Sequence, residues 1–205
     1  RVARGRCLSY GEGITYWPLA EVLKEHFGIL ESDTPQVVAE RLDDHPYLGL
    51  ALGLAAPAGV HPLVARERLH DSWVDFLDAL VAERPAVMLI EDVHWAEDDL
   101  CDLLETLVRQ VDGPLLVLAT ARPELLDRRP GWAGRQDDRH LRLEALPPDS
   151  AGRLLDELLG LQVPQALQEL DVERAEGNPF FVEELVATLI DLRVVRRENG
   201  GWSVG

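Results

Sequence analysis

A run of five apolar residues that ends in two acids constrains the fold more than any other feature of this chain. The run is Ala86-Val87-Met88-Leu89-Ile90, and it lies between Pro85 and the pair Glu91-Asp92. A short, continuous apolar run of this kind is typical of a strand buried on both faces in a parallel sheet. A similar run at 115–119 follows a helical pattern, and strands alternating with helices predict a doubly wound α/β layer.

Other periodic segments place further elements around these two strands. Residues 2–8 are predicted to form a short strand, residues 141–143 a third and more alternating strand, and residues 122–138 a long polar loop. The predicted helices carry an apolar residue every three or four positions. They span 17–26, 64–83 and 98–110, with shorter helices within 33–60.

The chain becomes helical after Pro147-Pro148. Asp149 and Ser150 are predicted to cap one helix, and Asn178 and Pro179 to supply the N-cap and first residue of another. Residues 194–204 have the pattern of a β-hairpin with its turn at Glu198-Asn199-Gly200-Gly201. The helix after Pro179 is expected to bury one apolar face, made of Phe181, Leu185, Val186, Leu189 and Ile190.

Charge and cysteine content narrow the functional classes. The chain has 37 acidic and 20 basic side chains, a formal net charge of −17. Such a surface repels nucleic acid and anionic membranes, so neither is expected as a direct partner of this segment. Cys7 and Cys101 form no CxxC motif, which favours a reduced, cytoplasmic setting, and no apolar run is long enough to span a bilayer.

The acids Glu91 and Asp92 are the first candidate site, because ligands of open α/β sheets bind at the carboxyl ends of the strands. An acid pair there can hold Mg²⁺, directly or through water, and polarise a nucleophilic water. Mg²⁺ bound in this way also needs substrate phosphates, so a nucleotide is the natural partner. Taken alone, the pair is more often a strand end that caps the following turn.

Thr120-Ala121-Arg122 follows the next apolar run, so Arg122 is expected on the same sheet edge as the acids. Its guanidinium there has two open roles: contact with a γ-phosphate, or a structural ion pair with the acids.

His94 and Trp95 follow the acid pair after a single residue, Val93. His94 either senses phosphate and orients water, or packs together with Trp95 against a neighbouring helix. A metal-dependent hydrolase that uses Glu91, Asp92 and His94 is the weakest hypothesis, since no paired-histidine spacing supports it.

The segment from Glu91 to Ala96 resembles the Walker B region of STAND-type ATPases, the signalling branch of the P-loop NTPases. In large bacterial regulators such modules accompany adenylate-cyclase-like, kinase, helical-repeat or LuxR-type DNA-binding domains. The resemblance spans nearly the whole chain. The other stretches that carry it are Gly5-Arg6-Cys7 with residues 10–19, residues 121–126, residues 174–185 and Gly200-Gly201-Trp202.

The resemblance implies a role for each residue of the strand edge. Glu91 and Asp92 would bind Mg²⁺ and activate water, and Arg122 would be the sensor residue. Thr120 and His94, at the same edge, are further candidates for contact with the nucleotide. The first acid is Glu91 rather than the commoner aspartate, so the division of work between the two acids stays open.

The resemblance also implies the domain plan. Gly177-Asn178-Pro179 is similar to the GxP motif of a helical lid, so Asn178 and Pro179 would lie near the adenine. Residues 1–146 would be the C-terminal part of the NTPase core, 147–192 the lid, and 193–205 the start of a winged-helix-like segment. ATP and other domains of the same polypeptide would be the partners, and homo-oligomerisation stays open.

The phosphate-binding loop of that family is not found in this sequence, which contains no Gly-Lys pair. We therefore expect the first strand and the P-loop to lie upstream of Arg1, and the chain to be a fragment with an incomplete P-loop NTPase sheet. The absent strand would lie between residues 115–119 and 141–143; otherwise those two strands would pair directly. The fragment is expected to be poorly stable and inactive alone.

The resulting functional expectation is part of an ATP-binding, ATP-hydrolysing signalling switch that regulates an output domain. The alternative is a nucleotide-free scaffold in which the acids are structural and the helical part binds a partner domain.

Overall fold

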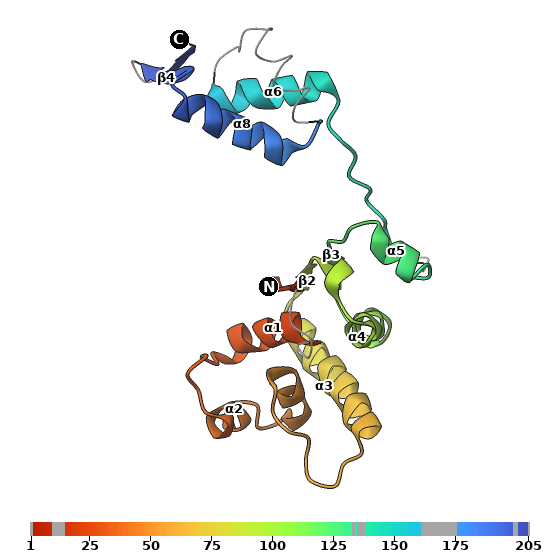
Figure 1. Cartoon of the computed structure of the whole chain (residues 1–205). Coiled ribbons are helices and arrows are strands. Elements are labelled where there is room, and N and C mark those ends of the chain that lie inside the picture. Colours follow the sequence, from red (N-terminus) through yellow and green to blue (C-terminus); the bar gives the residue numbers. More distant parts are fainter. Residues whose placement is uncertain are drawn as a thin grey trace. The chain divides into compact units, whose positions relative to one another are not determined.

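The computed structural model describes residues 2–9, 15–132, 134, 138–160, 176–198 and 201–204. The chain separates into two compact units, Arg1–Asp138 and Arg139–Gly205 (Figure 1). Each unit has a hydrophobic cluster of its own. Residues 10–14 of the resembling stretch 10–19, Asn199 and Gly200 of the predicted hairpin turn, and residues 174–175 of the 174–185 motif lie outside the described residues.

The first unit is built on a parallel sheet with the strand order β1-β2-β3. The register places Arg6 opposite Glu91 and Ile90 opposite Ala119. Three parallel strands with flanking helices confirm the predicted α/β class, and they are consistent with part of a P-loop NTPase fold. The strands are β1 (Val2–Arg6), β2 (Ala86–Glu91) and β3 (Leu115–Ala119).

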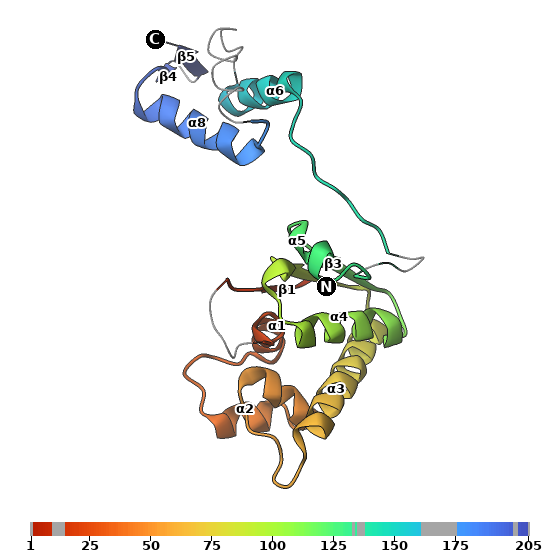
Figure 2. The same ribbon diagram turned by 45° about the vertical axis from the view of Figure 1, so that its right-hand side comes forward.

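The predicted helices of this unit are confirmed, and the long α3 and α4 lie side by side (Figure 2). Gly28 ends α1 in the left-handed conformation, which glycine adopts without steric cost. The elements are α1 (Trp17–Phe27), α2 (Pro35–Arg41), the 3₁₀ helix η1 (Pro46–Leu52), α3 (Pro62–Glu83), η2 (Val93–Trp95) and α4 (Asp98–Gln110).

A short helix, α5 (Glu124–Arg128), occupies part of the predicted polar loop. Leu125 is buried in the core and the Arg128 guanidinium donates a hydrogen bond to the Ala96 carbonyl at 2.7 Å. These two contacts order a segment whose composition indicated only a loop.

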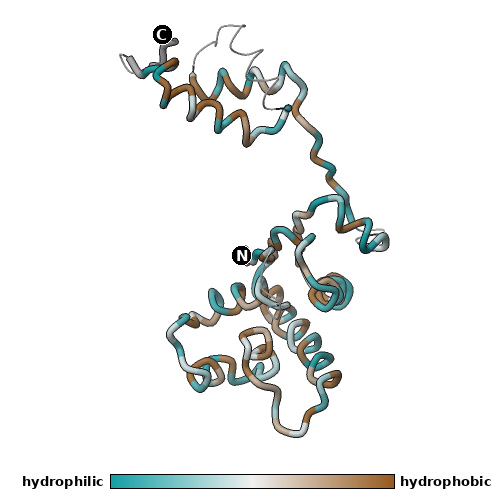
Figure 3. The backbone as a smooth tube through the Cα atoms, in the orientation of Figure 1, coloured by the Kyte–Doolittle hydropathy of each residue, from teal (hydrophilic) through white to brown (hydrophobic). Residues whose placement is uncertain are grey.

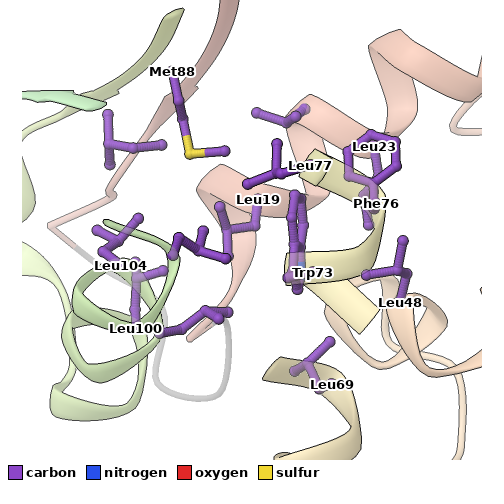
Figure 4. Close-up of a cluster of buried hydrophobic side chains, with 14 of the residues drawn as sticks. Leu19, Leu23, Leu48, Leu69, Trp73, Phe76, Leu77, Met88, Leu100 and Leu104 are labelled. Carbon is purple, nitrogen blue, oxygen red and sulfur yellow. The ribbon is translucent and has the colours of Figure 1, made fainter. Parts of the chain in front are cut away.

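The core of this unit lies between the sheet and the helices. Figure 4 shows Met88 of β2 pointing towards side chains of α1, α3 and α4. Apolar residues recur along those helices (Figure 3), and the buried ones belong to the same cluster. Its largest fully buried members include Trp73, Leu19, Leu23, Leu77, Met88, Ile90 and Leu104.

The two faces of the sheet are not equally covered. Ala86, Met88 and Ile90 are buried, whereas Val2, Leu116 and Leu118, which the register places on the opposite face, are 60%, 57% and 47% exposed. The prediction of strands buried on both faces is therefore wrong within the described residues. The apolar composition of the strands did not reveal that helices cover only one face.

Residues 141–143 do not form the predicted third strand. Leu141 and Leu143 are 86% and 94% exposed, and the described sheet ends at β3, so the direct pairing of 116–119 with 141–143 is also not observed. A strand needs a partner for its backbone N–H and carbonyl groups, and alternating side chains alone do not provide one.

The second unit contains α6 (Pro148–Leu159), α8 (Pro179–Asp191) and a hairpin of β4 (Val195–Glu198) and β5 (Gly201–Val204). The hairpin and the helix after Pro179 confirm the sequence prediction. Two details were wrong. The N-cap of α6 is Pro147 rather than Asp149 or Ser150, and Phe181 of α8 stays half exposed while Val182 is buried. The other predicted members of that face pack in the second cluster as expected: Leu185, Val186, Leu189 and Ile190.

No helix among the described residues is both long and apolar enough to cross a bilayer.

Candidate functional site

The acid pair lies where β2 ends, and its second member has an unusual backbone. Asp92 adopts the left-handed conformation with φ of 59°, which is uncommon for a residue other than glycine. This conformation turns the chain sharply from β2 into η2. The side chains of Glu91 and Asp92 are 27% and 33% exposed, so both carboxylates are partly open to solvent.

Thr120 connects this turn to the neighbouring strand. The Asp92 N–H donates to the Thr120 hydroxyl at 3.1 Å, the Val93 N–H donates to the Thr120 carbonyl at 2.9 Å, and the Thr120 N–H donates to the Ile90 carbonyl at 3.0 Å. One residue therefore fixes the backbone on both sides of Asp92. The sequence placed Thr120 at this edge but did not indicate its role in holding the acid.

Glu91 is paired with an arginine that was not among the residues selected from the sequence. Arg4 donates from Nε to Oε2 of Glu91 at 3.0 Å and from Nη2 to Oε1 at 2.9 Å, a two-pronged arrangement. The hydrogen bonds from Arg4, followed by its charge, hold the pKa of Glu91 below its usual value. Glu91 is therefore a carboxylate at neutral pH and a weak proton acceptor while Arg4 remains in place.

Asp92 has an arginine partner of its own, because Arg6 Nε donates to its Oδ2 at 2.8 Å. Arg4 and Arg6 are two positions apart in β1, so both side chains leave the strand on the face that carries Glu91. The alternation Arg4-Gly5-Arg6 at the end of the first strand is the sequence feature from which these ion pairs could have been predicted. Arg122 was the ion-pair partner considered from the sequence, and the ion pairs that the structure shows at the acids come from β1 instead.

Arg122 and His94 are brought together at the same edge. The Arg122 N–H donates to His94 Nδ1 at 3.4 Å, which fixes the backbone of the segment after β3 relative to η2. The rings of His94 and Trp95 lie 4.9 Å apart, and His94 Nε2 is buried without a hydrogen-bond partner among the described residues. His94 thus contacts the Trp95 ring and accepts a hydrogen bond from the Arg122 backbone.

The donor set suits part of a Mg²⁺ site. Mg²⁺ usually takes one or two carboxylates and completes its octahedron with water and substrate phosphate, and Glu91 and Asp92 offer two hard oxygen donors. No group of three or more His, Cys, Asp or Glu side chains able to hold a metal gathers among the described residues. Glu91, Asp92 and His94 therefore do not form the three-ligand centre that the metal-hydrolase hypothesis needs.

A second charge network, which the sequence did not reveal, supports the helix that follows the site. Asp102 of α4 accepts from Arg129 at 2.6 Å and from Arg66 of α3 at 2.9 Å. Hydrogen bonding from Arg129, and to a lesser degree from Arg66, lowers the pKa of Asp102, although burial opposes this. The network ties together α3, α4 and the segment after α5.

Asn178 and Pro179 belong to the second unit. The Asn178 side chain accepts a hydrogen bond from the Phe180 N–H at 3.1 Å, and Pro179 is the first residue of α8. Gly177 before them has φ of 72°, and a Cβ there would lie 2.5 Å from the Leu146 carbonyl oxygen. These three residues build the start of α8 and bring it against the segment before α6.

Comparisons with known proteins agree with the α/β fold. A family described as the AAA ATPase domain matches residues 1–118, and a domain of unknown function matches residues 148–203. The chain is 28% identical over 148 residues to an uncharacterized protein of Rhizobium meliloti (strain 1021).

That alignment covers 70% of this chain but only 14% of the relative, so the chain spans a small part of the relative's length. No solved structure matches the chain. The AAA ATPase match covers more than half of the sequence and includes β1, β2, the acid pair and β3 up to Leu118. The chain therefore belongs to the AAA ATPase domain family.

Proposed function

We propose that this chain is the Mg²⁺-side part of a STAND-type ATPase module, a switch in which nucleotide state controls an output domain of a longer protein. The observation that supports this proposal most strongly is the arrangement of side chains at the carboxyl edge of the sheet. Two solvent-accessible acids end β2, and Thr120 and Arg122 follow the adjacent parallel strand at the same edge. Ligands of parallel α/β sheets bind at this edge.

Glu91 and Asp92 would hold Mg²⁺ there, and the bound ion would neutralise phosphate charge. Thr120 keeps the Asp92 backbone in place by its hydroxyl and its carbonyl. The backbone of Arg122 is fixed by His94, so its guanidinium is the group we assign to the γ-phosphate. Asn178 and Pro179 are assigned to the adenine side, on the family resemblance alone.

The proposed module needs a phosphate-binding loop from elsewhere in the longer protein. The outer edge of β3 has no paired strand among the described residues, and Leu116 and Leu118 expose apolar surface beside it. An unpaired, apolar sheet edge of this kind is normally covered in a native protein. A further strand that carries the loop would pair there and bring the phosphates to Glu91 and Asp92.

A nucleotide-free scaffold is the second candidate, and one observation favours it. Both acids already have arginine partners, as in a structural ion-pair cluster. In that case the carboxylates stabilise the β1–β2 edge and bind no cation.

Nucleotide binding separates the two candidates. A version extended upstream should bind ATP with Mg²⁺, and Glu91→Gln with Asp92→Asn should remove the Mg²⁺-dependent part of that binding. The matched control removes two exposed acids of α3, Glu67→Gln with Asp71→Asn, and should bind as the parent does. The chain of residues 1–205 alone should show no binding in a micromolar titration. An extended protein that ignores ATP would support the scaffold.

A further inference from the structure

Three side-chain hydrogen bonds join two arginines of β1 to the two acids at the end of β2. We propose that Arg4 and Arg6 form a clasp that closes the Glu91–Asp92 carboxylates when no divalent cation is bound, and that a cation must displace both guanidinium groups to enter. The clasp describes how the same two acids are protected before a cation binds and released when it does. It therefore deepens the proposed function, and its biological role rests on that function.

The register shows that the clasp reaches along the strand towards the candidate site. Arg4 lies opposite Leu89 but binds Glu91, and Arg6 lies opposite Glu91 but binds Asp92. Each guanidinium is thus displaced towards the carboxyl edge relative to its own backbone partner. Both groups gather over the acids instead of pairing straight across the strands.

The clasp occupies the oxygens that a cation would need. Both carboxylate oxygens of Glu91 accept hydrogen bonds from Arg4, and one oxygen of Asp92 accepts from Arg6. A divalent cation needs oxygen lone pairs and is repelled by a neighbouring guanidinium, so cation and arginine compete for the same carboxylates. With both arginines paired to the acids, this edge carries two positive and two negative groups that neutralise one another.

The arginines are placed so that they can leave. Their side chains are 64% and 66% exposed, so released guanidinium groups would be solvated directly. Exposed ion pairs are weak and are screened by salt, whereas Mg²⁺ binds carboxylate together with phosphate. Cation entry with a nucleotide would therefore open the clasp and leave two positive charges beside the incoming phosphates of an otherwise acidic chain.

Binding of Mn²⁺ to the 205-residue chain, followed by the electron paramagnetic resonance signal of the free ion, tests the clasp without any nucleotide. Mn²⁺ shares the preference of Mg²⁺ for carboxylate oxygen. The variant Arg4→Gln with Arg6→Gln should bind Mn²⁺ about tenfold more tightly than the parent, since two exposed ion pairs together contribute on the order of that factor. Adding Glu91→Gln and Asp92→Asn should remove the gain.

A charge-matched control is needed because removing two arginines makes the chain more acidic. Arg68→Gln with Arg109→Gln removes the same charge from exposed positions whose recorded partners are Asp71 and Thr106. If this control gains as much Mn²⁺ affinity as the β1 variant, the effect is general electrostatics and the clasp is overturned. Circular dichroism checks that each variant keeps the parent fold.

A second readout needs no substitution. The Nε–H resonances of Arg4 and Arg6 in the parent chain should move on titration with Mg²⁺, while that of Arg68 should not. Unmoved Arg4 and Arg6 resonances at saturating Mg²⁺ contradict the clasp.

The Mn²⁺ experiments and the nucleotide-binding test can fail independently of each other. Tighter Mn²⁺ binding without ATP binding by the extended protein would support a switch operated by the cation alone and would remove the ATPase proposal. ATP binding by the extended protein without any gain in Mn²⁺ affinity would support the ATPase proposal and remove the clasp.

Discussion

The Asp92 N–H donates a hydrogen bond of 3.1 Å to the Thr120 hydroxyl across two neighbouring strands, and this contact holds the turn that presents the acid pair. Thr120→Val removes the hydroxyl while keeping the shape of the side chain. We expect a loss of about 1 kcal/mol in the free energy of unfolding, the usual net contribution of one hydrogen bond. Urea denaturation measures it. Thr120→Ser, which retains the hydroxyl, is the control, and equal losses in both variants would mean that the contact contributes nothing.

The left-handed backbone of Asp92 makes a second prediction. A β-branched residue is strongly disfavoured at φ of 59°, whereas asparagine tolerates it. Asp92→Val should therefore be less stable than Asp92→Asn by about 1–2 kcal/mol. Both variants lose the charge that pairs with Arg6, so the loss of this charge cancels in the comparison. Equal unfolding midpoints for the two would contradict the observed turn.

The close approach of β1 to α1 depends on Gly5. A Cβ at this position would lie 2.0 Å from the Pro18 carbonyl oxygen, and a backbone atom cannot move aside as a flexible side chain can. Gly5→Ala should cost about 3 kcal/mol through this clash. Gly131→Ala, where a Cβ meets nothing within 4 Å, is the matched control and should change stability little. Thermal unfolding of both variants decides the point.

The charge network at Asp102 predicts a pH dependence of stability. Because hydrogen bonds from Arg129 lower its pKa in the folded chain, the carboxylate contributes its stabilisation above its ordinary pKa of 3.8 and loses it as the pH falls through the lower folded value. Asp102→Asn should therefore flatten the decline in stability below about pH 4. Denaturant midpoints between about pH 2 and pH 7 measure this.

Asp112→Asn is the control for the Asp102 variant. Asp112 lies just beyond α4, and its backbone N–H, rather than its carboxylate, makes the contact with Asp78. The control should therefore keep the pH profile of the parent. Parallel pH profiles for the parent and the Asp102 variant would refute the prediction.

Much of the first unit could be predicted from periodicity because its strands and helices have strong local patterns. The boundaries of α4 and β3 agree with the sequence prediction, and α3 (Pro62–Glu83) begins slightly before the expected residue 64. The N-cap could be predicted where a side chain caps the helix, as that of Asn178 does. The predicted N-cap of α6 was wrong, because prolines begin that helix and no side chain caps it.

The parts that could not be predicted depend on contacts between distant segments. Residues 141–143 alternate like a strand, but alternation does not show whether a partner strand lies beside them. The exposure of Leu116 and Leu118 depends on which sheet face the helices cover, and both faces of β3 are apolar in sequence. For the candidate site, the position of Glu91 and Asp92 followed from the motif, whereas their pairing with Arg4 and Arg6 depended on the register between β1 and β2.

The Mg²⁺ dependence of ATP affinity, measured in a version of the protein extended upstream, tests the assignment of Glu91 and Asp92 most directly. We expect Mg²⁺ to strengthen ATP binding in the parent protein, and Glu91→Gln with Asp92→Asn to remove the strengthening while the fold is kept. ATP binding that is equally strong with and without Mg²⁺ in the parent, or unaffected by the two substitutions, would contradict the assignment of these acids to the Mg²⁺ side of a nucleotide site.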